Sequence, residues 1–314
     1  MRTAFLLIGA IVIIGLLSSP AYSQGRAPGN LLLTGKNVID EYSNNHVAVA
    51  AFDGKVFVAW TGVNDLHNVN IAYSDDGYTF PKKNVITLNE SSGAAPCLTV
   101  YGGELCLLWS DGGTGKIHVM FSPHTTSQRR YTLERDETRS TISGFPHKEF
   151  LAICWKGEDS ASRPNVLLSS DGINFDTSRK KVLESDSSRY HPAGASFAGK
   201  MVLAFVGVDQ EQRINVRHSS NDGNSWQNAP IMDIFSKSGP SLLVHGDRLI
   251  MAYAGTDGKI NIVHSADGIS FSNKTTFFTE ETQHSPTLTT FQDKVYMCWL
   301  GIDNRINIAK VEGF

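Results

Sequence analysis

The stretch YAGTDGKINIVHSADGISF, from Tyr253 to Phe271, contains two short apolar runs separated by turn residues. Its central phrase, G-x-D followed by a basic residue and I-N-I, returns at the end of the chain in WLGIDNRINIAKVEGF, from Trp299 to Phe314. Alignment on the asparagine of this phrase gives six copies, spaced by 48, 47, 50, 46 and 46 residues. A near-constant period of this length is the signature of a repeat architecture. The aligned position holds Asn70, His118, Asn165, Asn215, Asn261 and Asn307.

Each copy is expected to form four β-strands. In the first copy the strand-like runs are VAVAAF, KVFVAW, VNIAYS and KNVITL, and the first two flank the turn residues Asp53 and Gly54. Alternating apolar runs separated by D-G turns predict antiparallel hairpins, and no stretch has the period of a helix. Four strands repeated six times predict an all-β, six-bladed β-propeller rather than a β-helix or stacked sandwiches. The expected blades cover residues 45–89, 94–135, 140–184, 190–234, 238–280 and 284–314.

The last copy supplies only three strands before the chain ends. A strand-like segment, Leu31–Ile39, precedes the first full copy, and its KNVI resembles KNVITL of the first blade. We therefore expect Leu31–Ile39 to complete the sixth blade and close the ring.

The N-terminus has the pattern of a secretory signal peptide: Arg2, an apolar run from Ala4 to Leu17, and small residues before a cut between Ser23 and Gln24. The alternative is an uncleaved anchor. We expect residues 1–23 to be removed and residues 24–314 to form one exported, soluble domain. Without Arg2, 27 basic and 31 acidic residues remain, so no basic surface for nucleic acid is expected, and no membrane insertion follows cleavage.

Four cysteines in an exported chain could form disulfides. Cys154 and Cys298 each precede the tryptophan of an equivalent strand, which indicates buried core positions. Cys97 and Cys106 lie on two arms of one hairpin, two residues out of register, so a bridge between them is possible but not favoured. No spacing of Cys and His predicts a metal site, and no cofactor motif is present.

Four turns share an aspartate signature: SDDGYTF (74–80), SSDGINF (169–175), SSNDGNSW (219–226) and SADGISF (265–271). These turns resemble the Asp-box, or bacterial neuraminidase repeat, of sialidase-like propellers. Aspartate accepts hydrogen bonds from backbone amides of its own turn, so a structural role is expected rather than a catalytic one. The resemblance implies that these turns lie on the face away from an active site. The expected structural aspartates are Asp76, Asp171, Asp222 and Asp267.

The resemblance also implies a test for sialidase chemistry, because such enzymes grip the substrate carboxylate with three arginines. The first of these stands two residues before a proline at the start of an inner strand. The equivalent positions in this chain hold Ala94, Tyr190, Ser238 and His284, and the two copies without proline hold Asn45 and Ser140. No catalytic residue is therefore assigned.

The remaining candidates lie in loops that should share one face of the ring. Each G-x-D aspartate either caps its own loop or belongs to a repeated sugar site. We expect an exported carbohydrate- or ligand-binding propeller, with an exo-sialidase or a protein-interaction scaffold as alternatives. The candidate ligand-binding residues are Arg139, Arg189, Tyr190, His191, His284, Asp209, Asp257, Asp303 and Arg305.

Overall fold

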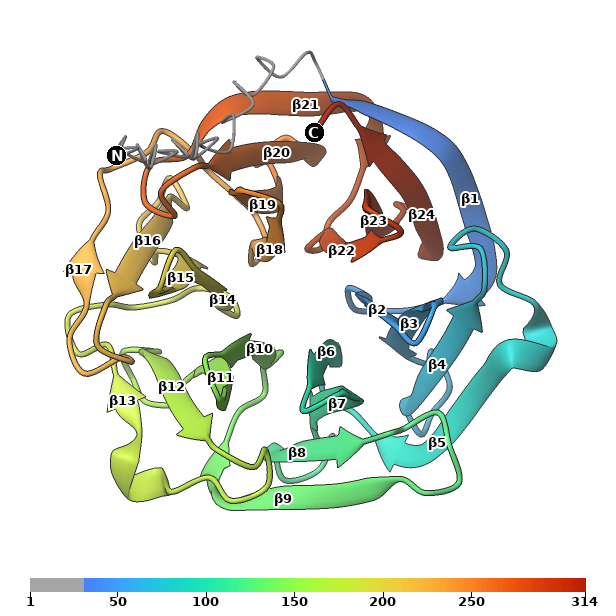
Figure 1. Ribbon diagram of the computed structural model, residues 1–314, viewed down its shortest axis with the longest axis horizontal. Coiled ribbons are helices and arrows are strands. Elements are labelled where there is room, and N and C mark those ends of the chain that lie inside the picture. The colour runs from blue at the N-terminus through green and yellow to red at the C-terminus, as the bar shows by residue number, and fades with distance from the viewer. Residues whose placement is uncertain (1–30) are drawn as a thin grey trace, which may run out of the picture.

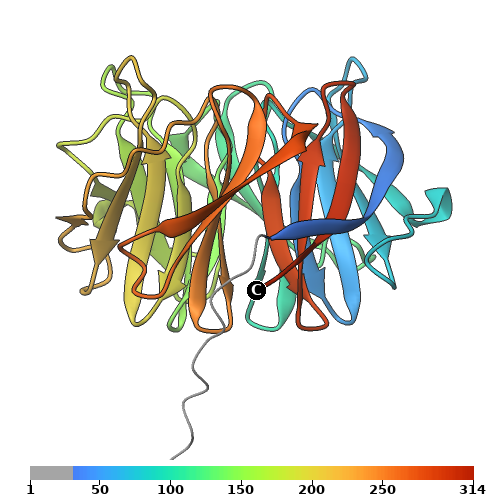
Figure 2. The same cartoon turned by 90° about the horizontal axis from the view of Figure 1, so that it is seen from above.

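The computed structural model describes residues 31–314, so the expected signal peptide and cleavage point lie outside the described residues. The chain forms six four-stranded antiparallel sheets arranged in a ring, which is the expected six-bladed β-propeller (Figure 1). Helix is limited in the described residues to two short 3₁₀ turns, Lys82–Asn84 and Thr177–Arg179. Seen from the side, the ring is a thick disc with loops gathered at its two faces (Figure 2).

The first three blades follow the repeat in order, from the innermost strand outward. Blade 1 contains β2 (Ala48–Phe52), β3 (Lys55–Thr61), β4 (Asn68–Ser74) and β5 (Val85–Ser91). Blade 2 contains β6 (Cys97–Tyr101), β7 (Glu104–Ser110), β8 (Lys116–Phe121) and β9 (Arg129–Glu137). Blade 3 contains β10 (Ser143–His147), β11 (Phe150–Lys156), β12 (Pro164–Ser169) and β13 (Lys181–Val182).

The next two blades repeat this order, and the sixth joins both ends of the described chain. Blade 4 contains β14 (Ala193–Phe197), β15 (Lys200–Val206), β16 (Ile214–Ser219) and β17 (Gln227–Asn228). Blade 5 contains β18 (Ser241–His245), β19 (Arg248–Ala254), β20 (Lys259–Ser265) and β21 (Ser272–Glu281). Blade 6 contains β22 (Thr287–Phe291), β23 (Lys294–Leu300), β24 (Arg305–Glu312) and β1 (Leu32–Tyr42).

The N-terminal strand closes the ring, as expected from the sequence. β1 pairs antiparallel with β24, with Leu32 opposite Glu312 and Ile39 opposite Ile306. The strand continues to Tyr42, three residues beyond the predicted segment. Ile39 is buried against Val58 of blade 1 and Cys298 of blade 6, so β1 also contributes to the core of the seam.

The core is divided into six apolar clusters, one between each pair of neighbouring blades. A single blade has two apolar faces and can bury them only against its neighbours, which is why the ring is the unit of stability. The aromatic residue that closes each second strand is almost completely buried. These residues are Trp60, Trp109, Trp155, Phe205, Tyr253 and Trp299.

The order of antiparallel strands fixes what lies on each face. The hairpins between first and second strands, and between third and fourth strands, lie on one face, which we call the hairpin face. The loops between second and third strands, and the connections between blades, lie on the other, which we call the loop face.

All four cysteines are free, including Cys97 and Cys106. No helix within residues 31–314 is long and apolar enough to cross a membrane.

Candidate functional site

The loop face is built from a second repeat that sequence analysis did not use. Each connection into a blade begins with a serine or threonine whose hydroxyl donates to nearby carbonyl oxygens. Ser236 Oγ, for example, lies 2.8 Å from Ser238 O and 2.7 Å from Ala254 O. In blades 1, 2, 3 and 5 such a bond reaches the last residue of the second strand and ties the connection to the blade that follows it, whereas in blades 4 and 6 the hydroxyl donates within the connection itself. The six residues are Ser43, Ser92, Thr138, Ser188, Ser236 and Thr282.

The G-x-D phrase occurs in blades 3 to 6, where its aspartate bonds to the backbone of the same loop. In blade 6, Asp303 Oδ1 accepts from the amide of Arg305 at 3.1 Å, and Asn307 Nδ2 donates to Arg305 O at 3.0 Å. A Cβ atom at Gly301 would lie 2.6 Å from Asp303 Oδ1, so a larger residue at this position would displace the aspartate side chain. Asp257 and Asp209 likewise accept from backbone amides of their own loops, at 2.9 and 3.3 Å. These aspartates therefore stabilise the conformation of their own loops.

In blades 2 to 6 the residue after this loop is basic, and it contacts the outer part of its own blade. In blades 2, 3 and 5 it pairs with a glutamate: Lys116 with Glu134, Arg163 with Glu184, and Lys259 with Glu281. In blades 4 and 6 the guanidinium lies over an aromatic ring: Arg213 over Phe235, at 5.3 Å from the ring centroid, and Arg305 over Tyr42, at 5.5 Å. Arg213 also pairs with Glu211 of its own loop, at 2.7 Å.

The Tyr42–Arg305 pair presents exposed recognition groups. Arg305 Nε donates to Tyr42 Oη at 3.1 Å, which fixes the guanidinium beside the ring. Tyr42 is 42% exposed, and Ile302, at the tip of the same loop, is 67% exposed. Blade 4 has the corresponding exposed tip residue in Val208. Two blades thus carry an aliphatic tip beside an arginine–aromatic pair on the loop face.

The other predicted ligand residues have varied surroundings. Arg189 Nη2 donates to the carbonyl oxygens of Val208 and Asp209, at 3.1 and 3.2 Å, so it braces the blade 4 loop. Tyr190 is half-buried against the cluster between blades 4 and 5. Arg139 has an exposed side chain, and its amide donates to Glu158 Oε1 at 2.7 Å. Of the nine predicted ligand residues, only His191 lines the axial cavity.

Histidines from opposite blades meet at the axis. The rings of His46, which precedes blade 1, and His191, which precedes blade 4, stack with centroids 4.6 Å apart. Burial holds the pKa of His46 well below its usual range, and the neighbouring His191 and His284 lower it further. Burial also lowers the pKa of His191 to about 4 and lowers that of His284. Both stacked rings are therefore neutral at pH 7.

His46 was missed by the sequence analysis, although its signal was present. Like His191, it stands three residues after the serine or threonine that recurs in each connection. The other blades have small residues there, and a Cβ atom at Gly239 would lie 2.5 Å from the His191 ring. Four small residues thus leave room for two imidazoles. The six positions hold His46, Ala95, Thr141, His191, Gly239 and Ser285.

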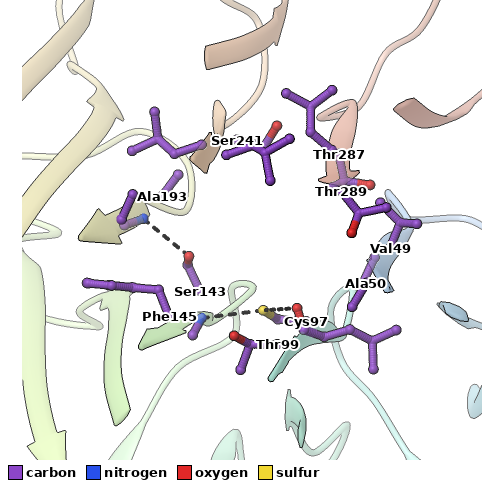
Figure 3. Close-up of a pocket in the computed structure, with 18 of the residues that line it drawn as sticks. Val49, Ala50, Cys97, Thr99, Ser143, Phe145, Ala193, Ser241, Thr287 and Thr289 are labelled. Carbon is purple, nitrogen blue, oxygen red and sulfur yellow. Dashed lines mark hydrogen bonds between the residues drawn. The ribbon is translucent and has the colours of Figure 1, made fainter. Parts of the chain in front are cut away.

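A cavity of about 390 Å³ occupies the axis below these histidines. Its wall consists of the six inner strands, and several wall side chains join neighbouring blades (Figure 3). The amide of Gly144 donates to Cys97 Sγ at 3.3 Å, and the amide of Gly194 donates to Ser143 Oγ at 3.2 Å. The cavity lining includes no Asp, Glu, Lys or Arg.

The aspartate turns lie on the hairpin face. Asp76 Oδ1 accepts from the amides of Thr79 and Tyr78, at 2.6 and 2.8 Å. The amide of Thr79, followed by the hydroxyl of Ser74, holds the pKa of Asp76 far below its usual range. Asp171 and Asp267 make the same pair of backbone bonds.

The aspartate turn of blade 4, at residues 219–226, differs from the sequence-based expectation. Its extra residue shifts Asp222 by one position, and Asn221 Oδ1 accepts the turn amide of Ser225 instead, at 2.9 Å. Asp222 Oδ1 lies 2.9 Å from His147 Nε2 and 2.6 Å from Lys148 Nζ, so it links blade 4 to blade 3. Asp222 is therefore a contact between blades rather than the acceptor of its own turn.

Comparison with known proteins places the chain by fold alone. No protein-family model and no curated protein matches the sequence. A structure of a protein of unknown function from Dyadobacter fermentans aligns with a TM-score of 0.68 at 12% identity, over 91% of this chain and 100% of that one. The chain is a six-bladed β-propeller.

Propellers of two functional classes share this fold. A Hadza microbial sialidase aligns with a TM-score of 0.64 at 13% identity, over 88% of this chain and 67% of the enzyme. The Aleuria aurantia lectin, in complex with Fucα1-6GlcNAc, aligns with a TM-score of 0.64 at 10% identity, over 85% of this chain and 92% of the lectin. The expected resemblance to sialidase-like propellers is confirmed at the level of the fold.

Proposed function

We propose that this chain is an exported ligand-binding propeller whose ligand is a carbohydrate. The observation that carries the proposal is the exposed Tyr42–Arg305 pair on the loop face, which has a counterpart in Phe235 and Arg213. An aromatic face packs against the C–H groups of a sugar ring, and guanidinium N–H groups donate to sugar hydroxyls. The fold supports the proposal because it is shared with a fucose-binding lectin along most of that lectin's length.

The arrangement of arginines argues against the alternative, an exo-sialidase. A substrate carboxylate needs guanidinium groups free to form paired hydrogen bonds within one pocket. In the described part of the chain Arg189 is bound to loop carbonyls, Arg213 to Glu211, and Arg217 to Asp186. The axial cavity, where an exo-acting site would be expected, has no charged lining. We therefore favour binding over hydrolysis.

The second alternative, a protein-interaction scaffold, has one supporting observation. Val63, Leu66, Val208 and Ile302 are exposed apolar residues at loop tips of the loop face. Exposed apolar side chains on one face favour docking of a partner. Failure to bind any glycan, together with co-purification of a fixed protein partner, would favour the scaffold.

A glycan array with the mature protein and two variants tests the proposal. Tyr42→Ala and Arg305→Ala should each weaken binding of the preferred glycan by about 10-fold or more, since each removes a direct contact. Arg163→Ala is the matched control, because Arg163 holds the equivalent position in blade 3 without an aromatic neighbour. Equal losses in all three variants would contradict this site. Turnover of a fluorogenic sialoside would contradict the binding function and support the enzyme.

A further inference from the structure

The axial cavity opens toward the hairpin face. The inner strands run from the loop face to the hairpin face, so their fourth residues lie near the hairpin end. At that level Val244 is 40% exposed and Pro146 is also exposed. Both residues belong to the cavity wall. A small molecule could therefore reach the cavity between these side chains.

The opposite end of the cavity is closed. The ring of residues that contains His46 and His191 lies at the loop-face end of the inner strands. Ala95 and Ser285 in this ring are each 1% exposed, and Gly239 is buried. The stacked imidazoles bridge the two opposite sides of the ring. The cavity is thus a blind shaft whose floor is the His46–His191 stack.

Most polar groups of the shaft are already used to join blades. Thr287 Oγ1 donates to Val47 O at 2.9 Å, Thr289 Oγ1 accepts from the amide of Ala51 at 3.0 Å, and Ser196 Oγ lies 2.8 Å from His147 Nδ1. Within residues 31–314, four polar side chains of the wall make no side-chain hydrogen bond: His46, Thr99, Thr141 and Ser241.

Two of these four groups are deeply buried. His46 is only 9% exposed, and the Ser241 hydroxyl is inaccessible to solvent and has no hydrogen-bond partner in the described chain. A buried polar group without a partner costs about 1–3 kcal/mol. This cost applies to the Ser241 hydroxyl, which no bound molecule can reach, whereas the ring nitrogens of His46 are not among the inaccessible atoms, so His46 is the group at the floor of the shaft that can make a polar contact.

The tautomer of His191 can be assigned from its neighbours. The Ser285 hydroxyl donates to Gly239 O, so its oxygen is left to accept from His191 Nε2, which lies 3.3 Å away. His191 Nε2 therefore carries the hydrogen, and Nδ1 is an acceptor. His46 makes no hydrogen bond within residues 31–314, so the unprotonated nitrogen of its neutral ring is free to accept one from a ligand.

We propose that the axial shaft is a binding site for a small neutral molecule with a compact apolar body and a hydroxyl group. The body would contact the apolar wall, including Leu98, Phe145 and Leu288, while the hydroxyl donates to His46 on the floor. The volume of about 390 Å³ lies in the range of roughly 300–1,000 Å³ typical of small-molecule sites. An ionic ligand is excluded, because the wall offers no opposite charge and desolvation would be uncompensated.

Three molecules of similar shape test the proposal on the mature protein by calorimetric titration: 1-naphthol, 1-methylnaphthalene and 1-naphthoate. We expect 1-naphthol to bind and to raise the melting temperature as its concentration rises. Methylnaphthalene should bind about 3–10-fold more weakly, as one hydrogen bond is lost. Naphthoate should not bind measurably. Equal affinity for naphthol and naphthoate, or no binding of naphthol, would overturn the proposal.

Substitutions at the opening and the floor of the shaft test where naphthol binds. Val244→Trp and Pro146→Trp narrow the opening from two different blades and should each abolish naphthol binding. Val208→Trp is the matched control, because Val208 is an exposed valine on the loop face, and it should leave naphthol affinity unchanged. His46→Phe keeps an aromatic ring in the stack and should reduce naphthol affinity about 3–10-fold without weakening methylnaphthalene. Circular dichroism of each variant verifies that the propeller is intact.

The outcome of these variants decides the site independently of the glycan test. Naphthol binding that survives both Val244→Trp and Pro146→Trp in folded protein would place the molecule outside the shaft and overturn the proposal. The shaft opens on the hairpin face, whereas Tyr42 and Arg305 lie on the loop face. Failure of either experiment therefore leaves the other proposal standing.

Discussion

Blade 6 takes its outer strand from the opposite end of the described chain, whereas blade 4 has an outer strand of only two residues. In blade 6, β1 pairs along β24 and places Leu31 and Ile39 in two different clusters between blades. In blade 4, β17 pairs at Arg217 and His218, and both of its own residues are exposed. The outer strand at the seam therefore carries core residues, whereas the outer strand of blade 4 carries none.

The third strands of blades 6 and 4 carry different side chains next to their outer strands. Position 309 of blade 6 is a buried alanine, and the equivalent position of blade 4 is Arg217. Arg217 lies over Phe205 and makes two hydrogen bonds to Asp186, at 2.5 and 3.0 Å. The carboxylate comes from the connection between blades 3 and 4. An ion pair thus covers the part of blade 4 that a longer strand would cover.

The largest expected effect is loss of the seam. Deletion of residues 31–42 should give unfolded or aggregated protein, because it removes two buried side chains, at about 2–5 kcal/mol each, and exposes β24 as an edge. That cost is comparable to the whole stability of about 5–15 kcal/mol of a typical domain. Size-exclusion chromatography and urea unfolding measure it. Gln227→Pro in β17 is the control and should cost about 1 kcal/mol or less. A folded monomer after the deletion would contradict the account of the seam.

A smaller effect is expected at the ion pair of blade 4. Arg217→Ala should destabilise the protein by about 2–4 kcal/mol, because it leaves the largely buried Asp186 carboxylate without a partner. The side chains of Arg217 and Asp186 are 15% and 11% exposed. The double variant with Asp186→Ala should lose less than the sum of the single losses, as measured by urea unfolding. Simple additivity would show that the pair does not hold blade 4.

The third prediction concerns the contact between Ser285, which precedes the first strand of blade 6, and His191, which precedes that of blade 4. The folded pKa of His191, about 4, lies below its usual value of 6.5, so the stability it contributes is present above pH 6.5 and is lost as the pH falls toward 4. Between pH 7 and pH 4 the free energy of unfolding should fall by about 2–3 kcal/mol less in His191→Phe than in the wild-type protein. Urea unfolding at several pH values measures the difference. Parallel curves for the two proteins would show that His191 does not titrate in this range.

The sequence was sufficient for the fold because each blade repeats the same apolar positions. Trp60 and Trp299 align by spacing alone, and the KNVI segment identifies the strand that closes the ring. The register of the aspartate turn of blade 4 was not predictable, because Asn221 and Asp222 compete for one acceptor role and only the hydrogen bonds of the turn distinguish them.

The candidate site was less accessible to sequence analysis. The residue type alone does not show whether a repeated Asp or Arg binds its own loop, as Asp257 does, or is exposed beside an aromatic ring, as Arg305 is. The stack of His46 on His191 joins residues 145 positions apart in opposite blades. The offset of three residues from a serine marks the equivalent position of each histidine, but only the geometry of the closed ring brings the two imidazoles into contact. The axial shaft has the same origin.

The pairing of β1 with β24 also has a consequence in time. Tyr42 is synthesised first and its partner Arg305 much later. At about 5–20 residues per second, the interval is on the order of tens of seconds. During that interval β1 has no partner, and no ring can form, however many blades have emerged. The chain therefore stays in an open state until its last strand is made.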